Sequence, residues 1–263
     1  MRRFVFGTLL LIGICLMAGV VCAQPGGKAD EKAEPKPPIN EVLNPLNEAF
    51  RARNDANAVT ALEAAVAAIK QEDRPAKEKT QILKAVQVGL GNRNDAIKMA
   101  TANALGRVGP AGAKPLVKAL KSKPIRKNRE VISAVIDALG LTRDEKGAVT
   151  ALLKIVTSDK DWTLRALAGR ALGNFDKTVA SGNSRKKICE KLIQIYESIQ
   201  SQASDGKDSD AVRKHTAIQG DFVSTLRTLT EEEWNSAADW RKWFNKAKRK
   251  RWPNPPKKKP AKS

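Results

Sequence analysis

The tripeptide Ala-Leu-Gly occurs three times in this chain at nearly constant spacing. The copies end at Gly106, Gly140 and Gly173, so they lie 34 and 33 residues apart. Each copy follows an Ala-rich stretch in which apolar residues recur every three or four positions, the pattern of an amphipathic helix. A short helix pair cannot bury its apolar face alone, so units of this length must stack on their neighbours. The spacing therefore predicts stacked helix pairs, with Gly as the expected stop of each first helix.

The composition supports an all-α fold. Hydrophobic residues make up 41% of the 263 residues, enough for a sizeable core, whereas aromatic residues make up only 5%. Strands favour aromatic and β-branched residues, while this chain is rich in Ala, Leu, Lys, Glu and Gln, which favour helices. An all-β protein is excluded on these grounds, and the length fits one elongated or two compact domains.

Apolar periodicity also places the other helices. Asp95, Asp161 and Asp210 precede similar helical segments, and we expect them to be N-caps, because Asp accepts hydrogen bonds from the free N–H groups there. We expect residues 201–210 to be a long loop and Gly220 to break the following helix. The remaining helices are expected at residues 39–50, 58–70, 76–90, 113–120, 147–156 and 185–200.

These segments resemble HEAT-type repeats, especially the short bacterial kind also seen in phycobilin lyase-like proteins. Residues 164–173 are most similar to the first-helix pattern of that family, and residues 97–106 are similar to it. Residues 131–140 depart from it, with Ile132 where a basic residue is usual. The period also fits tetratricopeptide and ankyrin repeats, but their signature residues are missing. The resemblance implies a right-handed α-solenoid of HEAT/armadillo-like helix pairs with a curved binding face, and it implies no chemistry.

The N-terminus has the pattern of an export signal. Arg2 and Arg3 precede an apolar run without charge at residues 4–21, and small residues before Gln24 form a cleavage site. Cleavage would leave a periplasmic or secreted protein. A retained N-terminal membrane anchor and a lipoprotein modified at Cys22 are the alternatives. A Pro- and Gly-rich segment follows and is expected to be a disordered linker.

The C-terminal part is rich in tryptophan. Trp240 and Trp243 lie in a Trp-x-x-Trp segment that resembles an end segment common in exported bacterial HEAT proteins. We expect Trp234, Trp240 and Trp243 to form an aromatic cap over the last repeat, and a platform that stacks on sugars or bases is the alternative. The expected organisation is a signal peptide at 1–23, a linker at 24–38, the solenoid at 39–230, a capping helix at 231–247 and a disordered basic tail at 248–263.

Positive charge is concentrated at the C-terminus. The whole chain carries a net charge of +20, and residues 241–263 contain eleven Lys and Arg and no Asp or Glu. Such an arm attracts anionic lipid headgroups, acidic surface polymers or nucleic acid, and it also serves to keep a protein soluble. The candidate polyanion-binding residues are Arg241, Lys242, Lys246, Lys248, Arg249, Lys250, Arg251, Lys257, Lys258 and Lys259.

Catalytic and metal-binding patterns are missing from the sequence. The chain has a single His, His215, and outside the export signal a single Cys, Cys189, which lies on an apolar helix face and is expected to be a buried hydrophobe. We therefore expect no cofactor, no metal and no enzyme activity. The function expected first is a scaffold that binds a protein on the concave face of the solenoid. A polyanion binder and an enzyme or accessory subunit are the alternatives. The candidate partner-binding residues are Lys114, Lys118, Lys121, Lys154 and Lys187.

Overall fold

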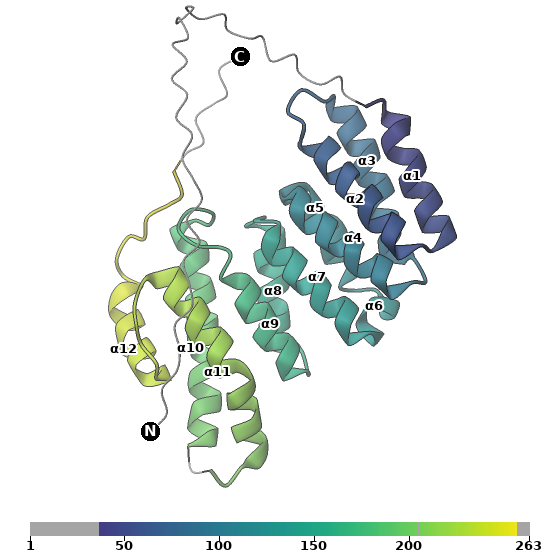
Figure 1. The fold of residues 1–263 in the computed structure, drawn as a ribbon. Coiled ribbons are helices and arrows are strands. Elements are labelled where there is room, and N and C mark those ends of the chain that lie inside the picture. The colour runs from purple at the N-terminus through teal and green to yellow at the C-terminus, as the bar shows by residue number, and fades with distance from the viewer. Residues whose placement is uncertain (1–36, 205, 257–263) are drawn as a thin grey trace, which may run out of the picture. The chain divides into compact units, whose positions relative to one another are not determined.

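A computed structural model describes residues 37–204 and 206–256 of the chain. Every regular element in this part is helical, and it contains no strand (Figure 1), which confirms the expected all-α class. The chain separates into a unit at Met1–Lys36 and a unit at Pro37–Ser263. The expected signal peptide and almost all of the expected linker lie outside the described residues.

Twelve α-helices and one 3-10 turn are found in the described part. They are α1 (Ile39–Ala52), α2 (Asp55–Lys70), α3 (Ala76–Val88), η1 (Gly89–Gly91), α4 (Asp95–Val108), α5 (Pro110–Ala119), α6 (Lys123–Lys127), α7 (Arg129–Leu141), α8 (Gly147–Ser158), α9 (Trp162–Leu172), α10 (Gly182–Ala203), α11 (Ser209–Thr230) and α12 (Ala237–Ala247).

The helices of the second unit pack in two layers. In the first layer α2 contacts α4, α4 contacts α7, α7 contacts α9, and α9 contacts α11. In the second layer α5 contacts α8, α8 contacts α10, and α10 contacts α12 (Figure 1). Buried apolar side chains such as Ile97, Leu105, Ile136, Leu152 and Ile193 fill the space between the helices. Each helix therefore buries its apolar side against its neighbours.

Two of the three repeated glycines do not stop their helices, contrary to expectation. Gly106 lies inside α4, and Gly140 lies inside α7. A Cβ at Gly140 would be 2.8 Å from the carbonyl oxygen of Ala171 on α9, closer than real Cβ atoms approach. Glycine is required here because neighbouring first-layer helices approach each other at the backbone. Only Gly173 follows its helix directly, and it keeps a right-handed helical conformation.

The expected helix N-caps are displaced by one or two residues in two of three cases. Asp161 caps α9 as expected, and its carboxylate accepts from the backbone N–H groups of Thr163 and Leu164. Asp95 is instead the first residue of α4, where Asn94 is the cap, and Asp208 rather than Asp210 caps α11. The Asp95 carboxylate instead pairs with Lys98 at 2.6 Å and also contacts the next repeat.

Polar contacts link residues that are one repeat apart. Asn128 Nδ2 donates to Asp95 Oδ2 at 2.6 Å, across 33 residues of sequence. Arg170 pairs with Asp137 at 3.1 Å, also 33 residues away. Arg126 pairs with Asp159 at 2.8 Å at the same separation. The 33-residue period of the sequence thus recurs as a period of side-chain contacts between neighbouring helices.

The last helices are longer than the sequence indicates. α10 continues to Ala203 and α11 begins at Ser209, so the loop between them is shorter than the expected residues 201–210. Gly220 lies within an unbroken α11. The short helix α6 was not expected. Thr230 is the last residue of α11, and Ser236 is the N-cap of α12.

Candidate functional site

A groove with a volume of about 790 Å³ runs between α5 and α8 in the second layer. Its floor is apolar. Val117 comes from α5 and Leu120 from its C-cap, whereas Ala151 and Ile155 come from α8. Val117 and Ala151 are half-buried. The groove therefore offers a hydrophobic surface that the described residues leave partly uncovered.

The local sequence explains why these side chains share one side of each helix. Val117 and Leu120 are three residues apart, and Ala151 and Ile155 are four apart, which places each pair on one helix face. The neighbouring residues Leu116 and Leu152 point into the protein core and are fully buried. α5 and α8 thus divide their apolar residues between the core and the groove.

Basic side chains form the rim of this groove. They are Lys121, Arg126, Lys146, Lys154 and Lys160. The rim contains one carboxylate, Asp159, and Arg126 pairs with it. Most of the positive charge of the rim is thus left uncompensated by the rim itself. Field lines of one sign concentrate in such a cleft and attract an oppositely charged partner.

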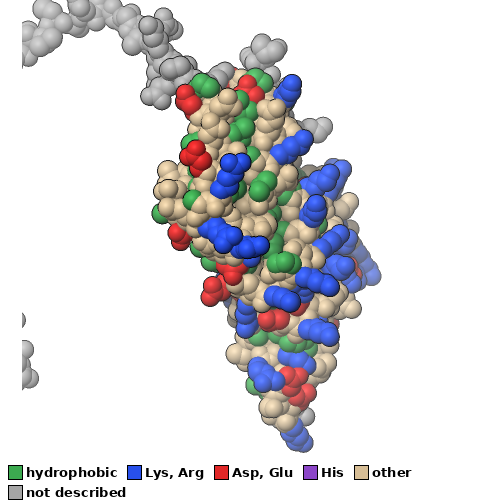
Figure 2. Space-filling model, turned by 90° about the vertical axis from the view of Figure 1, so that its right-hand side faces the viewer, with side chains coloured by type: hydrophobic (Ala, Val, Ile, Leu, Met, Phe, Trp, Pro, Cys, Tyr) green, Lys and Arg blue, Asp and Glu red, His purple; other side chains and the backbone are tan. Residues whose placement is uncertain are grey.

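The sequence also contains an indication of this site, in a run of basic residues outside the C-terminal tail. Residues 110–129 contain seven Lys and Arg and no Asp or Glu. They form α5, α6 and the loops around them. Figure 2 shows one face of the molecule, on which Lys and Arg side chains gather more densely than Asp and Glu. The folded part of the chain therefore has a basic region of its own.

The five candidate partner-binding lysines divide between this groove and its surroundings. Lys121 and Lys154 line the groove, one from each side. Lys114 and Lys118 are exposed on α5 but do not line it, and Lys187 is exposed on α10. The structure brings only two of the five together.

The C-terminal tryptophans are placed differently from one another. Trp240 is fully buried, and Trp243 is half-buried with its ring edge-on to that of Trp240, 5.8 Å between centroids. Trp234 is 38% exposed and is not part of this cluster. Trp252 takes its place, with its ring centroid 5.9 Å from that of Trp243. α12 thus packs along α10, and Trp252 lies against the N-terminal end of α10 at Gly182.

The residues after α12 are held against α10 rather than free. We call residues 250–256 the C-terminal strap. Arg185 Nη2 donates to the carbonyl oxygen of Pro253 at 2.6 Å, and Gly182 N donates to Asn254 Oδ1 at 3.0 Å. Trp252 Nε1 donates to the carbonyl oxygen of Ala247 at 3.0 Å. The prediction of a disordered tail from Lys248 onward does not fit residues 248–256. Residues 257–263 lie outside the described part.

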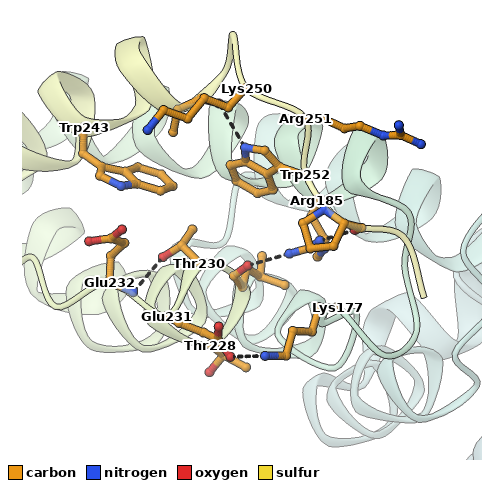
Figure 3. Close-up of a pocket in the computed structure, with 13 residues that line it drawn as sticks. Lys177, Arg185, Thr228, Thr230, Glu231, Glu232, Trp243, Lys250, Arg251 and Trp252 are labelled. Carbon is orange, nitrogen blue, oxygen red and sulfur yellow. Dashed lines mark hydrogen bonds and ion pairs between the residues drawn. The ribbon is translucent and has the colours of Figure 1, made fainter. Parts of the chain in front are cut away.

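Arg185 is the anchor of this strap. Its side chain also donates to the carbonyl oxygen of Leu229 near the end of α11, and its guanidinium lies 5.3 Å from the Trp252 ring centroid (Figure 3). Burial lowers the pKa of Arg185, against the attraction of nearby anionic groups. A pocket of about 240 Å³ remains beside it, between the strap and the end of α11. We assign Arg185 a structural role, because its bonds join α10, α11 and the strap.

The candidate polyanion-binding residues are not equivalent. Arg241 pairs with Glu197 on α10 at 2.8 Å. Lys250 accepts at its backbone carbonyl from Lys186 Nζ and belongs to the strap. Lys257, Lys258 and Lys259 lie outside the described residues. The remaining candidates are exposed: Lys242, Lys246, Lys248, Arg249 and Arg251.

Cysteine and histidine side chains act as nucleophiles or bases in many enzymes, but those of Cys189 and His215 are packed against other residues of the fold. Cys189 is fully buried, and this burial raises the pKa of its thiol. His215 stacks on Tyr196 with ring centroids 5.6 Å apart, and burial lowers its pKa. Within residues 37–204 and 206–256, no three His, Cys, Asp or Glu side chains are grouped so as to hold a metal ion. Cys189 is thus a core residue, and His215 is half-buried against Tyr196.

No protein-family model and no curated protein matches the chain. None of the helices between residues 37 and 256 is both long and apolar enough to cross a membrane.

Proposed function

We propose that this protein is an exported, non-enzymatic scaffold that holds a protein partner in the groove between α5 and α8. The observation that supports this proposal is the groove itself. It combines an apolar floor, Val117 and Ala151 being half-buried, with a basic rim. Partly exposed apolar surface bordered by polar residues is typical of protein interaction sites.

The scaffold is proposed to be an α-solenoid of the HEAT type. The helices contact mainly the next helix in their own layer and the helix adjacent in sequence. Polar contacts at a separation of 33 residues, such as Asn128 to Asp95, support equivalent packing of successive units. Repeat proteins of this kind present extended surfaces for partners.

The basic C-terminal arm is proposed to attach the protein to an anionic surface. The side chain of Lys246 is exposed near the end of α12, and those of Lys248 and Arg249 are exposed just after it. Near an anionic membrane each such residue contributes about 1 kcal/mol, and salt screens this attraction. The arm would thus concentrate the scaffold where its partner is found.

Partner capture from the native source tests the proposal. The tagged chain is compared with an Ala151→Glu variant, which places a charge on the groove floor, and with Asn103→Glu on the exposed side of α4 as the control. We expect Asn103→Glu to retain a defined partner at high salt and Ala151→Glu to lose it. Equal capture by both variants would refute the groove as the docking surface.

A polyanion-binding function is the second candidate, favoured by the exposed basic residues of α12 and its end. Deleting everything from Lys246 does not test it, because that deletion also removes the strap. A triple Gln variant of Lys246, Lys248 and Arg249 keeps the strap intact. If polyanion binding is the function, this variant loses most of the affinity, and the affinity of the unchanged chain falls steeply with salt.

A further inference from the structure

We infer that the occupant of the α5–α8 groove is an acidic amphipathic helix of a partner protein. This inference rests on the proposed function and adds the chemistry of the partner. Helix-in-groove recognition places the apolar face of one helix into an apolar channel, with anchors at i, i+3, i+4 and i+7. The apolar floor of the groove specifies the apolar face of such a helix, and the basic rim specifies the charge of the residues beside that face.

The floor specifies the apolar face of the occupant. The half-buried Val117 of α5 and Ala151 of α8 both line the groove, beside the buried Leu120 and Ile155. The volume of about 790 Å³ lies within the range of about 300–1,000 Å³ that is usual for ligand sites. A row of apolar side chains from one helix face fills such a space and removes it from water.

The rim specifies the sign of the charges on the flanks of the occupant. Lys121 and Lys154 stand on opposite sides, and within residues 37–204 and 206–256 neither lysine forms an ion pair. Asp159, the single carboxylate of the lining, is already paired with Arg126 and also accepts from the backbone N–H of Asp161. Glu or Asp residues on both flanks of a bound helix would meet these lysines, and basic flanks would be repelled.

The apolar floor argues against a polyanion as the occupant. A polyphosphate or an acidic polysaccharide would satisfy the rim but would leave the half-buried Val117 and Ala151 facing a hydrated chain. An extended peptide is also disfavoured, because strand addition needs a free sheet edge and residues 37–256 outside position 205 form no strand. A helix instead packs its side chains between α5 and α8 as a third helix does in a bundle.

Binding of designed peptides tests the inference. The first is a helix of about 18 residues, five turns, with Leu at i, i+3, i+4 and i+7, Glu on both flanks of the Leu face and Ala elsewhere. The second has the same composition in scrambled order, and the third has Gln in place of every Glu. We expect the first peptide to bind the full chain at least tenfold more tightly than either of the others.

Two matched charge reversals locate the site. Lys121→Glu/Lys154→Glu changes the rim, whereas Lys114→Glu/Lys118→Glu makes the same charge change on exposed α5 positions outside the groove. We expect the first pair to weaken binding of the acidic peptide at least tenfold and the second pair less than threefold. Because all four lysines are exposed, both variants should keep the wild-type circular dichroism spectrum and urea midpoint.

The outcomes separate this inference from the proposed function. Equal weakening by both charge reversals, or equal binding of the scrambled peptide, would overturn the acidic helix as occupant. Tight binding of the Gln peptide that Ala151→Glu abolishes would overturn the acidic partner but retain the groove as a docking surface. Self-association that Lys121→Glu/Lys154→Glu abolishes would assign the groove to a second copy of this chain and overturn the inference.

Discussion

Gly106 on α4 lies against the backbone of Ala138 on α7, so that a Cβ at Gly106 would be 2.9 Å from the Ala138 carbonyl oxygen. The same relationship recurs one repeat later between Gly140 and Ala171. The third residue of the repeated Ala-Leu-Gly tripeptide thus sets how closely first-layer helices approach. A larger side chain there must push two helices apart.

Gly106→Ala is therefore expected to destabilise the fold although Ala favours helices. Inserting a methyl group into packed structure costs about 1–3 kcal/mol. Gly220→Ala is the matched control, because that glycine lies within α11 and a Cβ there would meet nothing within 4 Å. It should stabilise the protein by about 0.5–1 kcal/mol. Urea unfolding measures both changes, and a stabilised Gly106→Ala variant would refute the close-approach role.

The C-terminal strap is expected to contribute to stability. Trp252→Ala removes a half-buried ring that contacts Trp243 and should cost about 2 kcal/mol. Trp234→Ala removes the same side chain from an exposed position and should change the stability by less than about 0.5 kcal/mol. Thermal unfolding distinguishes the two variants. Equal effects would show that the strap is not part of the cap.

Glu145 is expected to make the stability depend on pH. Burial opposes its ionisation, but hydrogen bonds from the hydroxyl groups of Ser181 and Ser184 outweigh burial and hold its pKa below the ordinary value. A carboxyl group with a lowered pKa stabilises the fold above its unfolded-state pKa of about 4.3, and this contribution disappears as the pH falls through the folded pKa.

Glu145→Gln should therefore be less stable than the unchanged chain at pH 7, and the difference should shrink as the pH falls below the unfolded-state pKa of about 4.3. Urea midpoints at pH 7, 5, 4 and 3 measure this. If the difference in urea midpoint between the two proteins stays constant from pH 7 to pH 3, the ionised carboxylate is not the form that accepts the hydrogen bonds from Ser181 and Ser184.

Cys189 is expected to be unreactive in the folded protein. Its thiol is fully buried and its pKa is raised, whereas the thiolate is the reactive form. In a chain with Cys15→Ser and Cys22→Ser, Cys189 is the only thiol. A thiol-specific disulfide reagent should label it only after unfolding in urea, at pH 7 and at pH 9 alike. Rapid labelling of the folded chain would show that the site is open.

The sequence predicted those features that depend on local periodicity. The helical class and most helix positions follow from apolar spacing, and the N-cap at Asp161 follows from its side chain alone. The repeat spacing of 33–34 residues reappears as the separation between Asp95 and Asn128. Such features depend on residues that are close in sequence or on a strict period.

Features that depend on contacts between distant residues were missed or misassigned. The role of Gly106 required knowledge of the backbone of Ala138, which no local pattern contains. The strap was predicted to be part of a disordered, basic tail. The hydrogen bond that holds it joins Arg185 to Pro253, 68 positions apart, so no local pattern reveals it. The groove was missed because its floor joins half-buried residues of two helices, although the acid-free run at residues 110–129 marked its basic side.

Site-specific photo-crosslinking tests the central claim most directly. A photoreactive amino acid is placed at Ala151 on the groove floor or at Asn103 on the exposed side of α4, and the chain is irradiated in its native source. We expect a discrete crosslinked protein from position 151 and none from position 103, with the crosslinked segment acidic and amphipathic in sequence. Crosslinks of the same partner from both positions, or from position 103 alone, would contradict it.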